Sequence, residues 1–238
     1  YFGSDKMIYP KPEFIGEVSS RIVKLERFNG EMISAIYLDN PRAKFVLLYS
    51  HGNADDLSSV EPLLKEYHTR GYAIMAYDYP GYGTSQGSPS EEGCYEAIDL
   101  VCEYLIKKKG RPSSEIVLYG RSLGGGPSID LASRRKFAGL ILEGTFTSTF
   151  RVMTKWRILP FDRFSNIDKI AEIESPILVI HGKQDEIVPF KHGVKLLTKA
   201  KSKKDFLWLE TASHNNVLEV GGVEYWNKLD GFIKNLSG

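Results

Sequence analysis

The chain has few cysteines, almost no net charge and no long hydrophobic run. Its two cysteines, Cys94 and Cys102, fall on one expected helix about two turns apart, too far from each other for a disulfide. Such cysteine usage fits a reducing compartment, so we expect a cytoplasmic location. The formal net charge is +1, and no field of one sign points to nucleic acid as a partner. No apolar stretch approaches the length of a membrane span, and no signal peptide is recognisable.

Motifs for metals and phosphates are also missing. The histidines lack the H-E-x-x-H spacing, the cysteines form no zinc pattern, and the triple glycine at 124–126 is not followed by the lysine of a phosphate loop. We therefore expect no metal and no cofactor. The chain starts at Tyr1 rather than Met. This start is consistent with a removed N-terminal anchor, which would add membrane contact to a cytoplasmic catalytic domain.

What is present is an alternation of strand-like and helix-like segments. Residues 21–27 and 32–38 read as a hairpin around Asn29-Gly30. Six later segments contain continuous apolar cores, as expected of strands buried on both faces: "FVLLYSHG", "YAIMAYDYPG", "EIVLYGRS", "AGLILEGTF", "PILVIHGKQD" and "DFLWLETASHNN". The fold class is therefore α/β, with a mostly parallel sheet, helices on both faces and an antiparallel N-terminal edge. No linker divides the chain, so we expect one domain over residues 1–238, with a short cap-like insert at 147–174.

The clearest helix signal runs from Pro89 to Lys109. Ser88 and Glu91 have the spacing of a capping box, and Pro89 would occupy the first helical position. Gly110 follows three lysines and predicts the end of the helix.

A serine lies among glycines between one such strand and one such helix. Residues 120–124 read Gly-Arg-Ser-Leu-Gly, which is G-x-S-x-G in the strand–turn–helix context of a nucleophile elbow. Glycines two residues before and after the serine would relieve crowding in a turn this tight. The helix N-terminus would favour negative charge that develops near Ser122. The pattern predicts that Ser122 is a nucleophile rather than an incidental turn residue.

An activated serine needs a base and an orienting acid. Proteins with such an elbow carry the acid and then the base after the serine in chain order. His214, in the loop after the last strand-like run, is the predicted base. Asp185, just past the strand "ILVIHG", is the predicted acid, because parallel sheets present catalytic groups at that end of their strands. Glu143, at the end of "GLILE", remains an alternative acid, or else a carboxylate that holds the adjacent loop.

The remaining requirement is a pair of N–H donors for an oxyanion. The backbone amide of Leu123, directly after the serine, is one predicted donor. The second is assigned to the backbone of Asn53, in the loop after "FVLLYS", where Gly52 allows a close approach. His51, in the same loop, is expected to pack beneath it rather than to act as a base.

These motifs together resemble the α/β-hydrolase-fold serine hydrolases. "HGNADDL", "YDYPGYGTSQGSPSE", "LYGRSLGGGPSIDLASR", "SPILVIHGKQDEIVPF" and "SHNN" follow the order of that family, and the likeness covers nearly the whole chain. Within it, "HGNA", "YDYPGYG" and "DLASR" are similar to the α/β-hydrolase-domain proteins of types seventeen and thirteen. The resemblance implies a triad of Ser122, Asp185 and His214. Some eukaryotic members remove palmitate from protein cysteines as thioesterases, although the N-terminal segment "YFGSDKMIYPKPEF" lacks their cysteines and "EGTF" replaces a serine-proline ending.

The insert at 147–174 is rich in large apolar side chains. Trp156 and Phe161 are its bulkiest members, and at least one is expected to line a site for an acyl chain, while about half of the others should face the core. The sequence thus predicts a serine hydrolase of acyl esters or thioesters that works through an acyl-enzyme, in the manner of a protein depalmitoylase or a lipid esterase. The alternative is a non-catalytic binding or scaffold protein on the same fold.

Overall fold

The computed structural model describes residues 22–148 and 164–237, which divide between Val117 and Leu118 into two compact units. The elements of the first unit are β1 (Ile22–Glu26), β2 (Met32–Leu38), β3 (Val46–Ser50), α2 (Leu57–Thr69), β4 (Ala73–Tyr77), α3 (Glu91–Lys109) and η1 (Ser113–Glu115). Strand β5 (Ile116–Arg121) continues into the second unit. The other elements of that unit are η2 (Ser122–Gly124), α4 (Gly125–Arg134), β6 (Gly139–Glu143), α6 (Asn166–Lys169), η3 (Ile170–Glu172), β7 (Ile177–Gly182), α7 (Lys191–Lys199), β8 (Lys204–Leu209) and α8 (Val217–Asn235).

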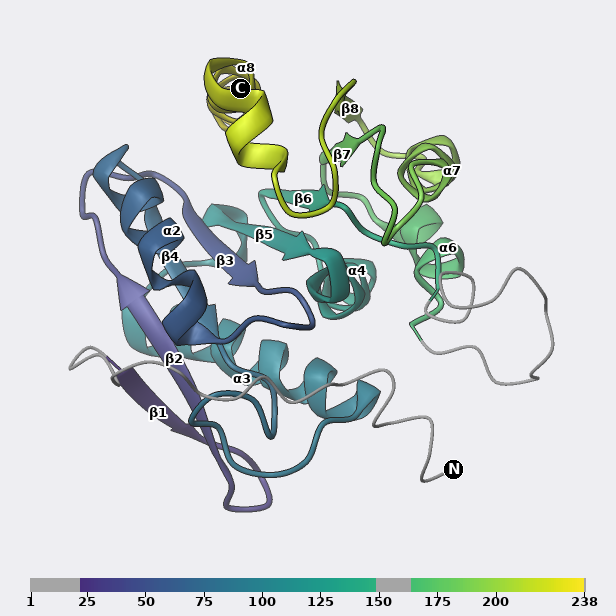
Figure 1. Ribbon diagram of the computed structural model, residues 1–238. Coiled ribbons are helices and arrows are strands. Elements are labelled where there is room, and N and C mark those ends of the chain that lie inside the picture. Colours follow the sequence, from purple (N-terminus) through teal and green to yellow (C-terminus); the bar gives the residue numbers. More distant parts are fainter. Residues whose placement is uncertain (1–21, 149–163, 238) are drawn as a thin grey trace, which may run out of the picture. The chain divides into compact units, whose positions relative to one another are not determined.

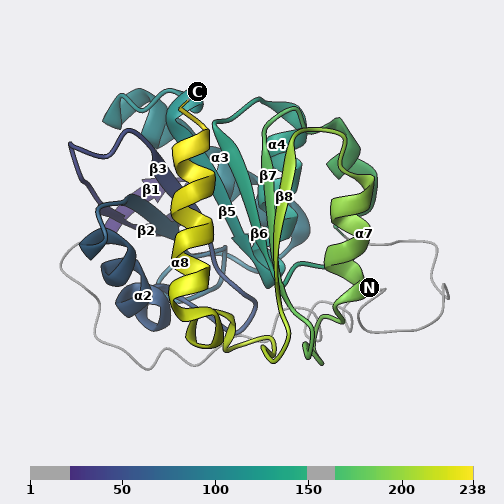
Figure 2. The same ribbon diagram turned by 90° about the horizontal axis from the view of Figure 1, so that it is seen from above.

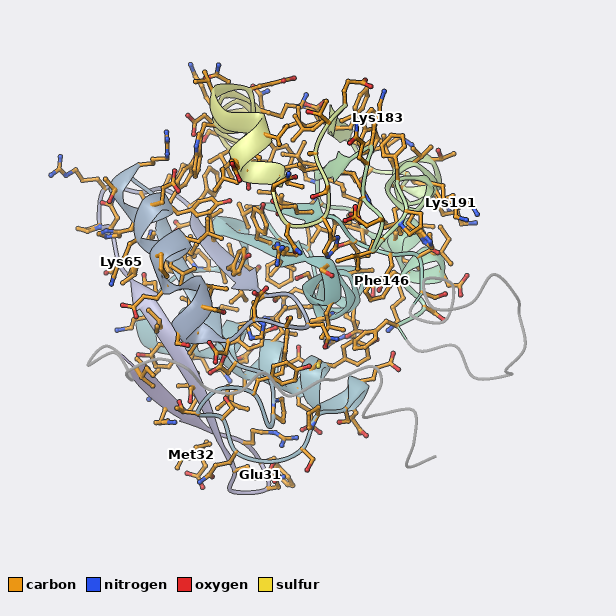
Figure 3. All side chains as sticks on the ribbon, in the orientation of Figure 1. Glu31, Met32, Lys65, Phe146, Lys183 and Lys191 are labelled. Atoms are coloured by element: carbon orange, nitrogen blue, oxygen red, sulfur yellow. The ribbon has the colours of Figure 1, made fainter. Side chains whose placement is uncertain are left out.

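The first unit contains the expected hairpin and the antiparallel edge. Strands β1 and β2 pair antiparallel with Glu26 opposite Met32, and the turn between them uses Gly30 at φ 83°. β2 pairs antiparallel with β4, and β4 pairs parallel with β3. All residues of β3 and β4 are buried, and Figure 1 shows α2 and α3 on opposite faces of these strands. On the outer side of α2, Lys65 extends into solvent (Figure 3).

The helix predicted from Pro89 begins two residues later than expected. Its N-cap is Ser90, whose Oγ accepts a hydrogen bond from the N–H of Gly93 at 2.9 Å, so the predicted Ser88 cap is wrong. Ser90 has the extended backbone of a cap and stands directly before the first helical turn. The predicted end is confirmed, because Gly110 closes the helix in the left-handed conformation at φ 66°.

The second unit contains parallel strands whose carboxyl ends lie at the same edge of the sheet. Strands β5, β6, β7 and β8 lie side by side in that order, and β6, β7 and β8 run parallel. Helices α7 and α8 both contact β7 and β8, from opposite faces (Figures 1 and 2). The predicted fold class is confirmed by these strands and by the antiparallel pairs of the first unit. The single domain over 1–238 stays a prediction.

Candidate active site

The turn that follows β5 has the backbone of a nucleophile elbow. Ser122 has φ 51°, a left-handed conformation that is uncommon for a residue other than glycine. A Cβ on Gly120 would lie 2.5 Å from the carbonyl oxygen of Gly124 and 2.6 Å from Cα of Gly125, so no larger residue fits there. The chain then turns through η2 directly into α4 (Figure 1). The Ser122 side chain is thus held in a strained turn before a helix N-terminus.

His214 joins Ser122 to Asp185. The hydroxyl of Ser122 lies 3.0 Å from Nε2 of His214, and Nδ1 of His214 lies 2.8 Å from Oδ2 of Asp185. A carboxylate only accepts hydrogen bonds, so Nδ1–H donates to Asp185 and Nε2 is free to accept the proton of the serine hydroxyl. Gly144, at φ 56°, leaves room beside the imidazole, since a Cβ there would be 3.3 Å from the ring. The structure brings the three predicted triad residues together in the predicted order.

Asp185 is held as an acceptor on both of its oxygens. Oδ1 accepts hydrogen bonds from the N–H groups of Ile187 at 3.0 Å and Val188 at 2.7 Å, and Oδ2 faces His214. Burial raises the pKa of this carboxyl, but contacts with His181 and His214 and the N–H of Val188 together lower it by more, and the pKa lies well below its ordinary value. Asp185 is therefore ionised at neutral pH and can stabilise a positive imidazole.

Glu143, the alternative acid, does not contact the imidazole. Its Oε2 accepts hydrogen bonds from the hydroxyls of Tyr119 and Tyr225, and its Oε1 lies 3.5 Å from Nε of Arg121. Two carboxylates therefore follow neighbouring strands, and only that of Asp185 bonds His214.

The predicted oxyanion donors lie in different units. Leu123 follows Ser122 within η2 of the second unit, and Asn53 lies in the loop after β3 of the first. The side-chain oxygen of Asn53 accepts a hydrogen bond from the hydroxyl of Tyr82 at 2.7 Å. The roles of both backbone amides remain a proposal.

His51 packs within the loop, as the sequence predicts. Its ring is fully buried against that of Tyr79, with 4.5 Å between centroids. Its Nδ1–H donates to the carbonyl of Gly52 at 2.8 Å, and its Nε2 lies 3.4 Å from Oδ1 of Asp78. Burial lowers the pKa of His51, but contact with Asp78 raises it by more.

The predicted acyl wall falls outside the described residues, because Trp156 and Phe161 lie in 149–163. The end of the insert is described, and there Phe164 belongs to the core. Its fully buried ring packs edge-on against Phe146 and fills the space that a Cβ on Gly126 would need.

Sequence reasoning missed two side-chain contacts beside the triad. Nε2 of the fully buried His181 lies 3.3 Å from Oδ2 of Asp185 and donates to the carbonyl of Val188 at 2.8 Å. The guanidinium of Arg121 donates to Oδ1 of Asn215 at 2.9 Å. His181 precedes Asp185 by four residues, which is a local signal, whereas Arg121 and Asn215 only adjoin the predicted nucleophile and base and lie 94 positions apart.

Sequence comparison with known proteins places the chain in a family. The family model described as serine aminopeptidase, S33, matches residues 40–167. The α/β-hydrolase domain-containing protein 17B of Xenopus tropicalis is 40% identical over 209 residues, which are 86% of this chain and 72% of that protein. The human protein of the same name is 39% identical over the same shares of the two chains. The chain belongs to the α/β-hydrolase-domain 17 family.

Solved structures agree with this family at the level of the fold. An esterase from Pyrococcus furiosus matches with a TM-score of 0.80 at 17% identity, over 96% of this chain and 97% of its own. An α/β serine hydrolase homologue from Coxiella burnetii matches with a TM-score of 0.70 at 19% identity, over 93% and 99%. As a member of this family, the chain is an α/β-hydrolase. Within residues 22–148 and 164–237, no helix combines the length and the apolar character needed to cross a membrane.

Proposed function

We propose that this α/β-hydrolase cleaves carboxylic esters or thioesters of acyl groups through an acyl-enzyme formed on Ser122. The observation that supports this most is the unbroken line of contacts from the Ser122 hydroxyl through His214 to Asp185, at 3.0 and 2.8 Å. A nucleophile, a base within hydrogen-bond reach and an ionised acid that orients the base are the parts that acyl transfer needs.

In the first half of the reaction, Oγ of Ser122 attacks the carbonyl carbon and its proton passes to Nε2 of His214. The imidazole is then positive, and the carboxylate of Asp185 stabilises it through the Nδ1–H bond. The carbonyl oxygen becomes an oxyanion, for which the amides of Leu123 and Asn53 are the proposed donors. Collapse of the tetrahedral intermediate breaks the bond to the alcohol or thiol, which leaves with the proton held by His214.

In the second half, water replaces the leaving group. His214 takes a proton from the water, whose oxygen attacks the acyl carbon of Ser122. The second intermediate collapses to a carboxylic acid, and the proton returns to Oγ of Ser122. The sulfur of a thioester takes the proton from His214 as the oxygen of an ester does, so the same residues serve esters and thioesters alike.

The first test is labelling of the purified chain with a fluorophosphonate, which reacts only with an activated serine. Wild-type protein should be labelled. Ser122→Ala should lose the label and about a thousandfold or more of its ester turnover, while it stays folded by circular dichroism. Failure of the wild type to label would favour a binding or scaffold role. Near-normal turnover of a folded Ser122→Ala variant would mean that another group is the nucleophile.

The second test defines the acyl site. Trp156→Ala and Phe161→Ala are compared on esters and thioesters of increasing chain length. If either ring lines the acyl site, its loss should harm long chains most, because each buried methylene contributes about 0.8 kcal/mol. Equal loss at every chain length would assign both rings to support of the fold. The ratio of thioester to ester turnover in wild-type protein then separates a depalmitoylase-like enzyme from a lipid esterase.

A further inference from the structure

The side chain of Arg121 joins the segment that carries Ser122 to the segment that carries His214. Arg121 directly precedes Ser122 at the end of β5. Its Nη2 donates to Oδ1 of Asn215 at 2.9 Å and lies 3.5 Å from the carbonyl oxygen of His214. The two residues in contact are thus the immediate chain neighbours of the serine and of the histidine.

The other edge of the guanidinium rests on a buried acid. Nε of Arg121 lies 3.5 Å from Oε1 of Glu143. Hydroxyls of Tyr119 and Tyr225 donate to Oε2 of Glu143, and these hydroxyls lie 2.6 Å from each other. Tyr119 lies two residues before Arg121 on β5 and therefore on the same face of the strand. Glu143 accordingly holds the arginine from β6, while Tyr225 ties the same carboxylate to α8.

A planar guanidinium suits this position, because its fixed fork of donors can face Glu143 along one edge and the histidine segment along the other. An ammonium group is a single point of charge and cannot hold both in one geometry. The backbone of His214 decides where its imidazole lies, and a misplacement of about 1 Å at a reacting group can cost about a hundredfold in rate.

We infer that Arg121 and Asn215 are positioning residues for the base, and that their side-chain hydrogen bond holds Nε2 of His214 within reach of the Ser122 hydroxyl. This inference rests on the proposed function. The hydrogen bond between them involves none of the reacting atoms. Glu143 orients Arg121 and so acts on His214 only through Arg121.

Asn215 offers the sharper experiment, because its side chain is exposed and its replacement removes no core packing. Asn215→Ala should lower kcat about tenfold with KM unchanged, and should slow fluorophosphonate labelling by the same factor, because only the approach of the base is impaired. Asn215→Asp keeps an acceptor for Arg121 and should retain near-wild-type kcat. Asn227→Ala, an exposed asparagine of α8, is the matched control and should change nothing.

Arg121→Lys tests the other end of the bond while a positive charge stays beside Glu143. It should lower kcat at constant KM, and the double variant with Asn215→Ala should lose no more than the more affected single variant, because both remove one interaction. Additive losses would overturn the inference. So would wild-type kcat and labelling in Asn215→Ala, or failure of Asn215→Asp to keep activity. If the wild type itself is not labelled by the fluorophosphonate, both the proposed function and this inference are wrong. If the wild type is labelled and Asn215→Ala is unaffected, only this inference is wrong.

Discussion

The ends of β6 and β7 carry two carboxylates with similar burial and different surroundings. Glu143 is the last residue of β6, and Asp185 follows the end of β7 by three residues. Asp185 accepts backbone N–H groups on one oxygen and the imidazole of His214 on the other. Glu143 accepts two tyrosine hydroxyls on one oxygen and faces Arg121 with the other.

The difference shows that the role of a carboxylate depends on its hydrogen-bond partners rather than on its burial or its position at a strand end. The backbone N–H groups bind Oδ1 of Asp185 and leave Oδ2 to the imidazole of His214. An imidazole can carry a proton, because it can gain and lose one near neutral pH. A guanidinium stays charged and tyrosine hydroxyls stay protonated in that range, so the surroundings of Glu143 offer it no proton carrier. Glu143 is thus suited to hold structure, and Asp185 to orient a base.

Replacement of Asp185 should have the larger effect on activity. Asp185→Asn keeps the size of the side chain, but an amide in place of Oδ2 can favour the wrong tautomer of His214. Ester turnover should fall about a thousandfold or more, as for the acid of other triads. Steady-state kinetics on a short acyl ester measures this, with circular dichroism to verify folding. Turnover within tenfold of the wild type would mean that Asp185 is not the acid that orients His214.

Replacement of Glu143 should have a much smaller effect. Glu143→Gln keeps an acceptor for the tyrosine hydroxyls and loses the ion pair with Arg121, so kcat should fall only about fivefold to tenfold through the position of His214. The same assay compares it with Asp185→Asn. If Glu143→Gln proves the more damaging change, the acid has been assigned to the wrong strand.

The contrast between these carboxylates also shows how far sequence reasoning reached. Continuous apolar runs predicted the strands, and G-x-S-x-G between β5 and α4 predicted the strained turn at Ser122, because both are local properties of the chain. The choice of acid was not local. The sequence predicted Asp185 and left Glu143 as an alternative, because both stand at the end of an apolar strand. Their partners from distant segments, His214 for Asp185 and Tyr225 for Glu143, separate the two carboxylates.

Other sequence predictions had the same limit. Ser88 and Ser90 both have cap chemistry, and the backbone around them decides which one begins α3. The contact between Arg121 and Asn215 joins residues 94 positions apart, so no periodicity in the sequence could reveal it.

The smallest expected effect concerns stability in acid. In the folded chain the pKa of Asp185 lies below its ordinary value, so unfolding lets this carboxylate take up a proton at a pH where the folded state does not. The unfolded state then binds more protons, and the free energy of unfolding rises with pH in that range. The stability from Asp185 is fully present above the unfolded pKa of about 4 and is lost as the pH falls toward the lower folded pKa.

Asp185→Asn has no such proton to bind, so its free energy of unfolding should change less between about pH 5 and pH 3 than that of the wild type. Urea titrations at several pH values, followed by circular dichroism, measure the two slopes. Ser122→Ala is the matched control, because it alters the same site and keeps the carboxylate, and it should retain the wild-type slope. A wild-type slope in Asp185→Asn as well would mean that other groups carry the acid dependence, and that His181, His214 and the backbone of Val188 do not hold Asp185 ionised as the structure implies.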